Sequence, residues 1–279
     1  MSTLKLGLIG DNIARSRSPL LHTLAGRQNG IAVSYDRLVP PALASDFDTV
    51  FAGCAEGGYR GINITYPYKE KVFPKLTVTD PLVRAIGAIN TVIFEADGPK
   101  GHNTDHSGFM AAYRGVRGDT APGTVLMIGT GGVGRAVAFG LLGLGASELR
   151  LVDRDRAKAE ALAEELRAAG TARVVVMDDA EAAAEGAHGL INCTPVGMVG
   201  YEGTPLAAGA MHGAQWVFDA VYTPADTQFL KDAAAAGLAV ISGWELFYWQ
   251  GVHAWKHFSG TPLDEGQLRE ALLSSDEVV

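Results

Sequence analysis

The chain has 279 residues, of which 47% are hydrophobic and 19% are charged, with a formal net charge of −8. This length allows two domains, because single hydrophobic cores stop growing near ~250 residues. The acidic balance argues against nucleic acid or an anionic membrane as a partner. No stretch reaches the ~18 apolar residues of a membrane span, and the first residues lead into a strand rather than a signal peptide, so we expect a cytoplasmic protein.

The two cysteines, Cys54 and Cys193, match no metal-binding spacing. Nothing in the sequence predicts a disulfide between them. We expect both to be small buried apolar residues, and we expect no metal site.

In the first half of the chain, apolar or alternating runs predict strands over 4–9, 33–39, 61–65 and 88–94. A helix is expected from Ser18, which would act as the N-cap before Pro19, with further helices over 41–56 and about 106–113. Residues 115–123 contain several glycines and a proline, and we interpret them as a linker between two domains.

Polar side chains follow several of these strands, where open α/β sheets usually build their sites. Ser16 and Ser18 at a helix start form a natural anion pocket, and Lys69 follows the strand 61–65. Asn90 lies in an apolar run and needs hydrogen-bond partners, either structural or from a ligand. Taken singly, each has a structural alternative: a capped helix, a solvated lysine, a buried asparagine, and Asp105 as a helix cap.

The second half opens with an apolar strand, 125–128, that runs into Gly129-Thr130-Gly131-Gly132-Val133-Gly134 and then into helical composition. This order is typical of dinucleotide binding, because glycines allow the tight turn, the approach of a pyrophosphate and close helix packing. A purely structural glycine turn is the alternative. The next strand, 148–152, ends at Asp153, close to the roughly 20 residues after the first glycine where such folds place the acid that binds the adenosine ribose.

Strands predicted over 173–177, 189–193, 216–221 and 238–241 alternate with helices such as 154–169 and 178–185. This alternation predicts a parallel, doubly wound sheet. After Gly243 the sequence is helical and aromatic, with the spacing of a buried or half-buried helix that packs back toward the first domain. We expect residues 115–243 to bind the dinucleotide, and residues 1–114 plus 244–279 to bind substrate and carry the catalytic groups.

Six segments, in order along nearly the whole chain, resemble motifs of the shikimate and quinate dehydrogenase family. They are Gly7-Leu8-Ile9-Gly10 with Ser16-x-Ser18-Pro19-x-x-His22, Gly61-x-Asn63-Ile64-Thr65-x-Pro67-x-Lys69, Gly87-Ala88-Ile89-Asn90-Thr91, Asn103-Thr104-Asp105, Asn192-x-Thr194-Pro195-x-Gly197-Met198 and Val221-Tyr222-x-Pro224. Two places depart from the family pattern: Arg15 replaces a histidine, and Gly243-Trp244-Glu245-Leu246 replaces Gly-x-x-Met.

The resemblance implies an N-terminal α/β substrate-binding domain and a Rossmann domain for NAD(P). It implies reversible oxidation of a ring hydroxyl of shikimate or quinate to the 3-dehydro ketone, with Lys69 as acid/base and Asp105 as its orienting partner, although the sequence does not separate their roles. Ser16, Ser18 and Tyr222 would hold the substrate carboxylate, and Thr65, Asn90 and Gln250 would contact ring hydroxyls. The expected cofactor contacts are Gly129, Thr130, Gly131, Gly132, Val133, Gly134, Asp153, Arg154, Thr194, Val221 and Gly243.

Asp153 predicts NAD rather than NADP, because an acid there accepts from both ribose hydroxyls and repels a 2′-phosphate. Biosynthetic members of the family usually have Asn-Arg-Thr at this point and use NADP. Arg154, between Asp153 and Asp155, keeps NADP possible. The partner is then a carboxylate polyol, and monomer and homodimer both remain open.

Two other functions remain open. A dehydrogenase of the same fold for an aminoshikimate or another quinate-like acid is suggested by the altered segment after Gly243. A non-catalytic nucleotide-sensing module is the third possibility, and intact Lys69 and Asp105 argue against it.

Overall fold

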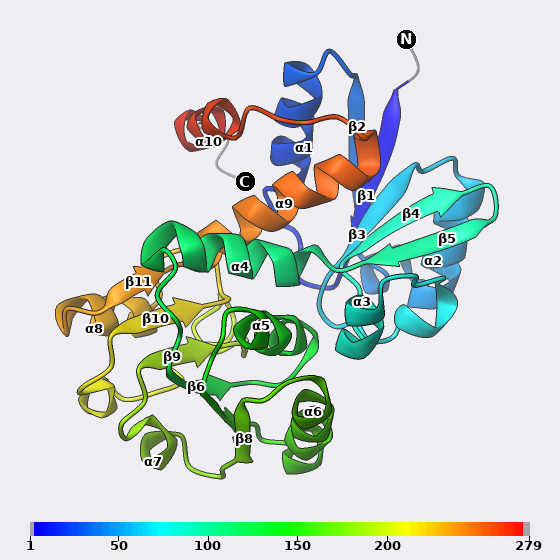
Figure 1. Cartoon of the computed structure of the whole chain (residues 1–279). Coiled ribbons are helices and arrows are strands. Elements are labelled where there is room, and N and C mark those ends of the chain that lie inside the picture. The colour runs from blue at the N-terminus through cyan, green and yellow to red at the C-terminus, as the bar shows by residue number, and fades with distance from the viewer. Residues whose placement is uncertain (1–2, 276–279) are drawn as a thin grey trace. The chain divides into compact units, whose positions relative to one another are not determined.

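The computed structural model describes residues 3–275, which form two compact α/β units (Figure 1). Unit 1 contains the described residues up to Thr104 and those from Gln250 onward, and unit 2 runs from Asp105 to Trp249. The two divisions lie inside helices α4 (Thr104–Arg117) and α9 (Gly243–Ser259). The boundaries expected from the sequence, after residues 114 and 243, lie in or at the start of the same two helices.

Unit 1 is built on a five-stranded sheet in the order β2-β1-β3-β4-β5. The strands are β1 (Leu4–Ile9), β2 (Val33–Leu38), β3 (Gly61–Ile64), β4 (Thr91–Glu95) and β5 (Gly98–His102). β1 is parallel to β2 and β3, whereas β4 is antiparallel to both of its neighbours. The sequence did not predict β5, because Gly98-Pro99-Lys100-Gly101-His102 has no alternating apolar pattern, and its pairing with β4 makes it a strand.

The helical segments of unit 1 correct two predictions. The single helix expected over 41–56 is interrupted, because Ala44 has a positive φ of 49° and Asp46 caps a new helix by accepting from the Thr49 N–H at 2.7 Å. Ser18 is the first residue of its helix and does not cap it, since the N-cap position is Arg17. The helical segments are α1 (Ser18–Gln28), η1 (Pro41–Leu43), α2 (Phe47–Glu56), η2 (Phe73–Lys75), α3 (Pro81–Ile86) and α10 (Glu265–Ser274).

Apolar side chains of α2 and the sheet form a buried cluster in unit 1, with Phe47 and Phe51 against Ile62 and Ile64. The C-terminal helix α10 packs on α1, as the sequence predicted. The Arg17 guanidinium joins the two helices by donating to the Leu272 carbonyl at 2.7 Å. A cation at the C-terminal end of a helix also interacts favourably with the helix dipole.

Unit 2 is built on a six-stranded parallel sheet in the order β11-β10-β9-β6-β7-β8. The strands are β6 (Thr124–Ile128), β7 (Glu148–Val152), β8 (Arg173–Val176), β9 (Gly189–Asn192), β10 (Trp216–Asp219) and β11 (Ala239–Ile241). The chain leaves β6 toward β7 and later returns to β9 on the other side of β6. This reversal is the topological switch point, at whose carboxyl edge doubly wound sheets bind their ligands.

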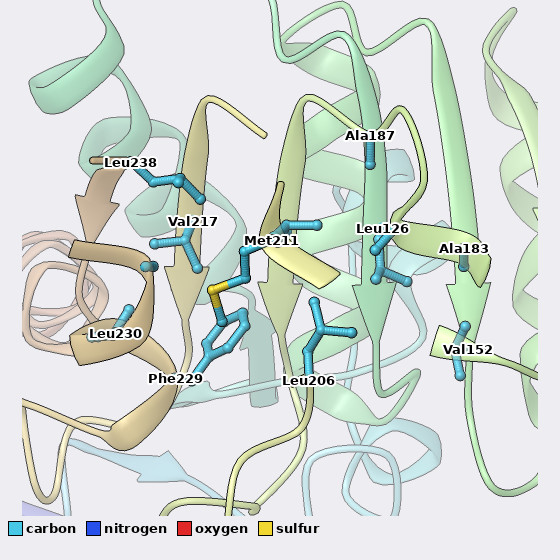
Figure 2. Close-up of a cluster of buried hydrophobic side chains, with 13 residues drawn as sticks. Leu126, Val152, Ala183, Ala187, Leu206, Met211, Val217, Phe229, Leu230 and Leu238 are labelled. Atoms are coloured by element: carbon cyan, nitrogen blue, oxygen red, sulfur yellow. The ribbon is translucent and has the colours of Figure 1, made fainter. Parts of the chain in front are cut away.

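Helices and apolar packing complete unit 2. Its remaining helical segments are α5 (Gly132–Gly143), α6 (Arg156–Ala169), α7 (Ala180–Ala184), η3 (Ala208–Met211) and α8 (Gln228–Ala235), the last of which the sequence did not predict. Figure 2 shows one core cluster, in which Leu126 of β6 and Val217 of β10 lie in the same apolar layer as Met211 and Phe229. The predicted linker 115–123 is shorter than expected, because α4 continues to Arg117.

Among residues 3–275, no helix has the length and apolar character needed to cross a membrane. Within the same residues, no group of three or more His, Cys, Asp or Glu side chains is placed to hold a metal ion. Cys54 and Cys193 are buried and neither forms a disulfide, which confirms their predicted role as small buried residues.

Candidate active site

The strand directions of unit 1 bring the predicted substrate residues to one edge of its sheet. β1 and β3 are parallel neighbours, so Ser16 after β1 and Thr65 after β3 leave from the same edge. β4 is antiparallel to β3, with Thr91 paired to Asn63, so Asn90 just before β4 lies at that edge too. The strand order therefore places these three residues, which are far apart in the sequence, at one edge of the sheet.

The two serines form a fixed pair of hydroxyl groups. The Ser16 Oγ donates to the Ser18 Oγ at 3.1 Å, and the Ser18 N–H donates to the Ser16 Oγ at 3.3 Å. The Arg37 guanidinium donates to the Ser16 carbonyl at 2.7 Å and so anchors the loop that carries Ser16. This pair can offer neutral donors to an anionic group, which fits the carboxylate-binding role predicted for Ser16 and Ser18.

Asn90 is the centre of a buried amide and hydroxyl network in unit 1. Its Nδ2 donates to the Thr104 Oγ1 at 2.9 Å and to the Gln250 Oε1 at 3.5 Å, and its Oδ1 accepts from the Thr104 N–H at 2.7 Å. Asn63 adds a further contact, its Nδ2 lying 3.2 Å from the Asn90 carbonyl. This network is compatible with a structural role for Asn90 and with a role in ligand binding. It also joins Asn90 to Gln250.

Sequence reasoning assigned no role to Thr104 or Asn63. Both lie inside the motifs that carried the family resemblance, next to residues that were assigned. That position was the available signal, and the contacts with Asn90 make both part of the site.

The backbone of Lys69 is attached to the segment that carries Asn90, because the Ile89 N–H donates to the Lys69 carbonyl at 2.9 Å. Thr65 is anchored by its own N–H, which donates to the Ile9 carbonyl at 2.9 Å. Asp105 lies in the first turn of α4, directly after Thr104, and is the first residue of unit 2. The pairing of Lys69 with Asp105 remains a prediction.

His22, a member of the N-terminal motif, is buried among aromatic rings. Its ring stacks on Tyr35 with centroids 5.1 Å apart and meets Phe258 edge-on at 5.3 Å. Burial lowers the pKa of His22 to about 3, against the opposing effect of a hydrogen bond with Asn63. The imidazole is therefore neutral at physiological pH and supports Asn63 rather than exchanging protons.

In unit 2, three glycines of the turn after β6 serve three different purposes. Gly129 has a φ of +97°, and a Cβ there would lie 2.8 Å from the Cys193 carbonyl oxygen. A Cβ on Gly134 would lie 2.3 Å from the Gly129 carbonyl oxygen, so only glycine lets α5 start this close to the turn. A Cβ on Gly131 would meet no atom within 4 Å, which leaves room for a ligand to approach the backbone.

The start of α5 complements this open position. Gly131 is the N-cap residue, and Gly132 and Val133 are the first residues of the helix. Their N–H groups lie at the positive end of the helix dipole, where a phosphate binds favourably. This part of the turn fits the pyrophosphate of a dinucleotide.

Asp153 lies directly after β7 and contacts the glycine turn. Its Oδ2 accepts from both the N–H and the hydroxyl of Thr130, each at 2.7 Å, and its Oδ1 accepts from the Asp155 N–H at 2.9 Å. Burial raises the pKa of Asp153, but the hydrogen bonds from Asp155 and Thr130 more than offset this effect and hold the pKa below its ordinary value. Arg154 is exposed beside it.

A buried amide organises the loop after β9. The Asn192 Oδ1 accepts from the N–H and the hydroxyl of Thr194, at 3.0 and 2.7 Å, and its Nδ2 donates to the Asp219 Oδ1 at 2.9 Å. Thr194 is thereby fixed against the glycine turn, since its methyl carbon would lie 2.9 Å from a Cβ at Gly129. Thr194 and the turn line the switch point between β6 and β9.

The carboxylate of Asp219, the last residue of β10, continues this network. It accepts from the Val221 N–H at 3.0 Å and from the Thr227 hydroxyl at 2.6 Å, and burial raises its pKa to about 6. Val221 in turn packs against Gly243, where a Cβ would lie 2.3 Å from the Val221 carbonyl oxygen. Asp219 therefore connects two of the predicted cofactor contacts, Val221 and Gly243, to the segment that carries Thr194.

Sequence reasoning missed Asp219 and assigned no role to Asn192, although Asn192 lies in one of the family motifs. A polar residue at the end of an apolar strand was the available signal. Tyr222, which was predicted to hold the substrate carboxylate, belongs to unit 2, where its ring stacks on Phe247 with centroids 5.0 Å apart. Its role toward the serines of unit 1 remains a prediction.

Two family models match segments of the chain, one in unit 1 and one in unit 2. The model described as the shikimate dehydrogenase substrate binding domain matches residues 8–92. A second model, described as NADP oxidoreductase coenzyme F420-dependent, matches residues 124–199, which include the glycine turn and the switch point.

Similar proteins cover the chain almost completely. The chain is 37% identical over 276 residues to a quinate/shikimate dehydrogenase (NAD(+)) of Corynebacterium efficiens, covering 96% of this chain and 97% of that protein. It is 40% identical over 273 residues to a shikimate dehydrogenase (NADP(+)) of Haloarcula marismortui, covering 95% and 98%.

A solved structure agrees with these relatives. Quinate dehydrogenase from Corynebacterium glutamicum in complex with NAD superposes with a TM-score of 0.88 at 35% identity, covering 98% of this chain and 99% of that one. The two-domain α/β architecture, the motif order and this similarity agree. The chain belongs to the shikimate/quinate dehydrogenase family of NAD(P)-dependent oxidoreductases.

Proposed function

We propose that the chain catalyses the reversible, NAD-dependent oxidation of a ring hydroxyl of quinate or shikimate to the 3-dehydro ketone. One observation supports it most strongly: the strand order of unit 1 gathers the serine pair, Lys69 and the Asn90 network at one sheet edge. A serine pair suits a carboxylate, and an amide and hydroxyl network suits a polyol. NAD is the preferred cofactor, in agreement with the relatives named for NAD(+).

The proposed chemistry divides between the two units. When bound to unit 2, the nicotinamide ring supplies the hydride acceptor. In unit 1, Lys69 takes the proton that leaves the substrate hydroxyl during oxidation, and a general base must lie within hydrogen-bond reach of that proton. We propose that Asp105 orients the lysine and accepts from the same hydroxyl.

The remaining predicted contacts would hold the substrate still. Ser16, Ser18 and Tyr222 would bind its carboxylate, and Thr65, Asn90 and Gln250 would bind ring hydroxyls. Because Asn90 and Gln250 are hydrogen-bonded to each other, a substrate hydroxyl would join a network that already exists. Such pre-formed positioning lowers the entropic cost of reaching the transition state.

A substrate panel tests the proposed function. Quinate, shikimate and an amino analogue are each incubated with NAD and with NADP, and reduced nicotinamide is followed by absorbance. We expect turnover on quinate or shikimate, fastest with NAD. Turnover on the amino analogue alone would favour the second candidate, which the altered segment Gly243-Trp244-Glu245-Leu246 suggests. Cofactor binding without turnover on any polyol would favour a nucleotide sensor.

Substitution of Lys69 tests the proton transfer. We expect Lys69→Ala to lower kcat by about 100-fold or more, the size of a general acid–base contribution. Lys71→Ala is the matched control, because Lys71 pairs with Asp48 and has no role in the proposal. Near-normal turnover of Lys69→Ala on quinate and shikimate would contradict the assignment.

We also propose that the protein works in the cytoplasm. Its two cysteines are buried thiols that form no disulfide, which suits a reducing compartment. Cell fractionation with antibody detection checks this location, and recovery of the protein outside the cytoplasmic fraction would contradict it.

A further inference from the structure

The C-terminal helix α10 is hydrogen-bonded to both ends of α1 in unit 1. At the end of α1, the Gln28 Nε2 donates to the Gln267 Oε1 at 2.7 Å. At the start of α1, the Arg17 Nη2 donates to the carbonyls of Leu272 and Ser275, at 2.7 and 3.4 Å. The two ends of α1 are roughly 15 Å apart by helical rise, so these are two separate attachments.

Arg17 connects α10 directly to the serine pair. It is the residue between Ser16 and Ser18, whose hydroxyl oxygens lie 3.1 Å apart, and it occupies the N-cap position of α1. Its own carbonyl accepts from the Leu21 N–H at 3.0 Å. The backbone of Arg17 is therefore bonded into α1 while its side chain is bonded to α10, so α10 restrains the positions of both neighbouring serines.

The end of α10 is well suited to hold a guanidinium group. Leu272 lies in the last turn of α10 and Ser275 is its C-cap, where helix carbonyls have no partner within the helix. A charged donor makes stronger hydrogen bonds than a neutral one and also interacts favourably with this end of the helix dipole. The Arg17 Nε is buried and Leu272 is 0% exposed, so the side chain is packed rather than solvated.

We infer that Arg17 is a positioning residue through which α10 holds Ser16 and Ser18 in the orientation that binds the substrate carboxylate. The inference rests on the proposed function and adds the C-terminal helix to the parts of the chain that set substrate affinity. Neutral hydroxyl groups must be aimed at an anion, because hydrogen bonds weaken steeply when they are misaligned. The carboxylate does not react, so loss of its alignment should raise KM rather than lower kcat.

The experiment measures kcat and KM for quinate or shikimate, whichever the full chain oxidises faster, at saturating NAD. Arg17→Met keeps an apolar stem of similar length and removes the donors. We expect it to raise KM about tenfold, a part of the value of a hydrogen bond to a charged group, and to change kcat less than about twofold. The Kd for NADH, measured by nucleotide fluorescence, should stay at the wild-type value, because unit 2 binds the dinucleotide in the proposal.

Gln28→Ala is the matched control, because it removes hydrogen bonds to α10 at the opposite end of α1. Both variants should lower Tm, but only Arg17→Met should raise KM. A salt series separates positioning from direct attraction between Arg17 and the substrate, which salt would screen. We expect the ratio of KM between Arg17→Met and the wild type to be the same at low and at high salt.

If Arg17→Met does not fold, Arg17→Lys decides the question. The lysine ammonium group ends one bond nearer to the backbone than the Arg17 Nη2, so this variant keeps the charge but reaches the α10 carbonyls less well. We expect KM to rise about threefold in Arg17→Lys, between the values of the wild type and Arg17→Met.

Three results would overturn the inference: an unchanged KM in folded Arg17→Met or, where that variant does not fold, in Arg17→Lys; an equal rise of KM in Gln28→Ala; or a KM ratio that disappears at high salt. Absence of turnover by the wild-type protein on both quinate and shikimate would instead overturn the proposed function, so the two failures are distinguishable.

Discussion

Two carboxylates at strand ends of the same sheet have pKa values that are shifted in opposite directions. Asp153 follows β7 and Asp219 ends β10, and each accepts three hydrogen bonds from the chain. The pKa of Asp153 lies below its ordinary value, whereas the pKa of Asp219 is raised to about 6. Asp219 is 0% exposed and Asp153 is partly exposed, so burial decides the sign when the number of hydrogen bonds is the same.

The difference matches two tasks. The role predicted from the sequence for Asp153, repulsion of a 2′-phosphate, requires a carboxylate that remains charged and near solvent, and the lowered pKa and partial exposure of Asp153 are compatible with that role. A carboxylate that holds loops together needs donors from several segments, and Asp219 receives them from β9, from Val221 and from Thr227. Asp219 is therefore a structural organiser of the cofactor side.

The largest expected effect is that of Asp219→Ala. The change leaves the Asn192 amide, the Val221 N–H and the Thr227 hydroxyl without this acceptor, and each buried unsatisfied donor costs on the order of 1–3 kcal/mol. We expect the free energy of unfolding to fall by about 4 kcal/mol in urea denaturation. Asp226→Ala is the control, because Asp226 is exposed in an ion pair with Lys231 and should cost less than about 1 kcal/mol. If Asp219→Ala lowered the free energy of unfolding no more than Asp226→Ala does, the buried hydrogen bonds of Asp219 would not be important for stability.

The second prediction concerns pH. Since the folded pKa of Asp219 is about 6, above the ordinary 3.8, its protonation stabilises the fold. That stabilisation is complete below about pH 4 and is lost as pH rises through about 6. Asp219→Asn keeps the shape and lacks the titration, so it should gain about 2 kcal/mol relative to the wild type between pH 4.5 and 7.5.

Urea melts of wild type and Asp219→Asn at the two pH values check this prediction. Parallel pH dependence of the two proteins would show that Asp219 does not titrate in this range. The same melts on Asp153→Asn provide the contrast, because the folded pKa of Asp153 is lowered. Its stabilising contribution is present above the ordinary pKa and is lost only as pH falls below it.

The smallest expected effect is that of Asp153→Ala on stability. Asp153 is partly exposed, so water can replace the carboxylate for the exposed Asp155 N–H, whereas the buried Thr130 hydroxyl loses its acceptor, and we expect a loss of about 1.5 kcal/mol. Thermal unfolding measures it. A loss as large as that of Asp219→Ala would mean that burial does not separate the two sites.

The sequence predicted most of unit 2 because its signals are local. The strand before Gly129, the glycine turn and the strand that ends at Val152 all lie where the apolar pattern placed them. Gly129 and Gly134 are glycines because neighbouring backbone atoms leave no room for a Cβ, whereas a Cβ on Gly131 would meet no atom within 4 Å. Such requirements are visible in the residue type itself.

Other elements depended on non-local contacts. β5 exists because β4 pairs with it, and the helix expected over 41–56 is broken where Ala44 adopts a left-handed conformation and Asp46 starts a new helix. Neither the strand β5 nor the break in the helix has a strong apolar periodicity in the sequence that would predict it. Propensity is a weak signal that tertiary contacts override.

The sequence by itself determined the residue types of the site: two serines, a lysine, an asparagine, a glycine turn and an acid after the second strand of unit 2. The tertiary structure alone decided which of them lie together, because strand order places Thr65 and Asn90 at one sheet edge, and because the turn places the Thr130 hydroxyl in hydrogen-bond contact with Asp153. The physical reason is that side-chain chemistry is a property of the residue type, whereas the side chains that lie together depend on strand order and on contacts between segments far apart in the sequence.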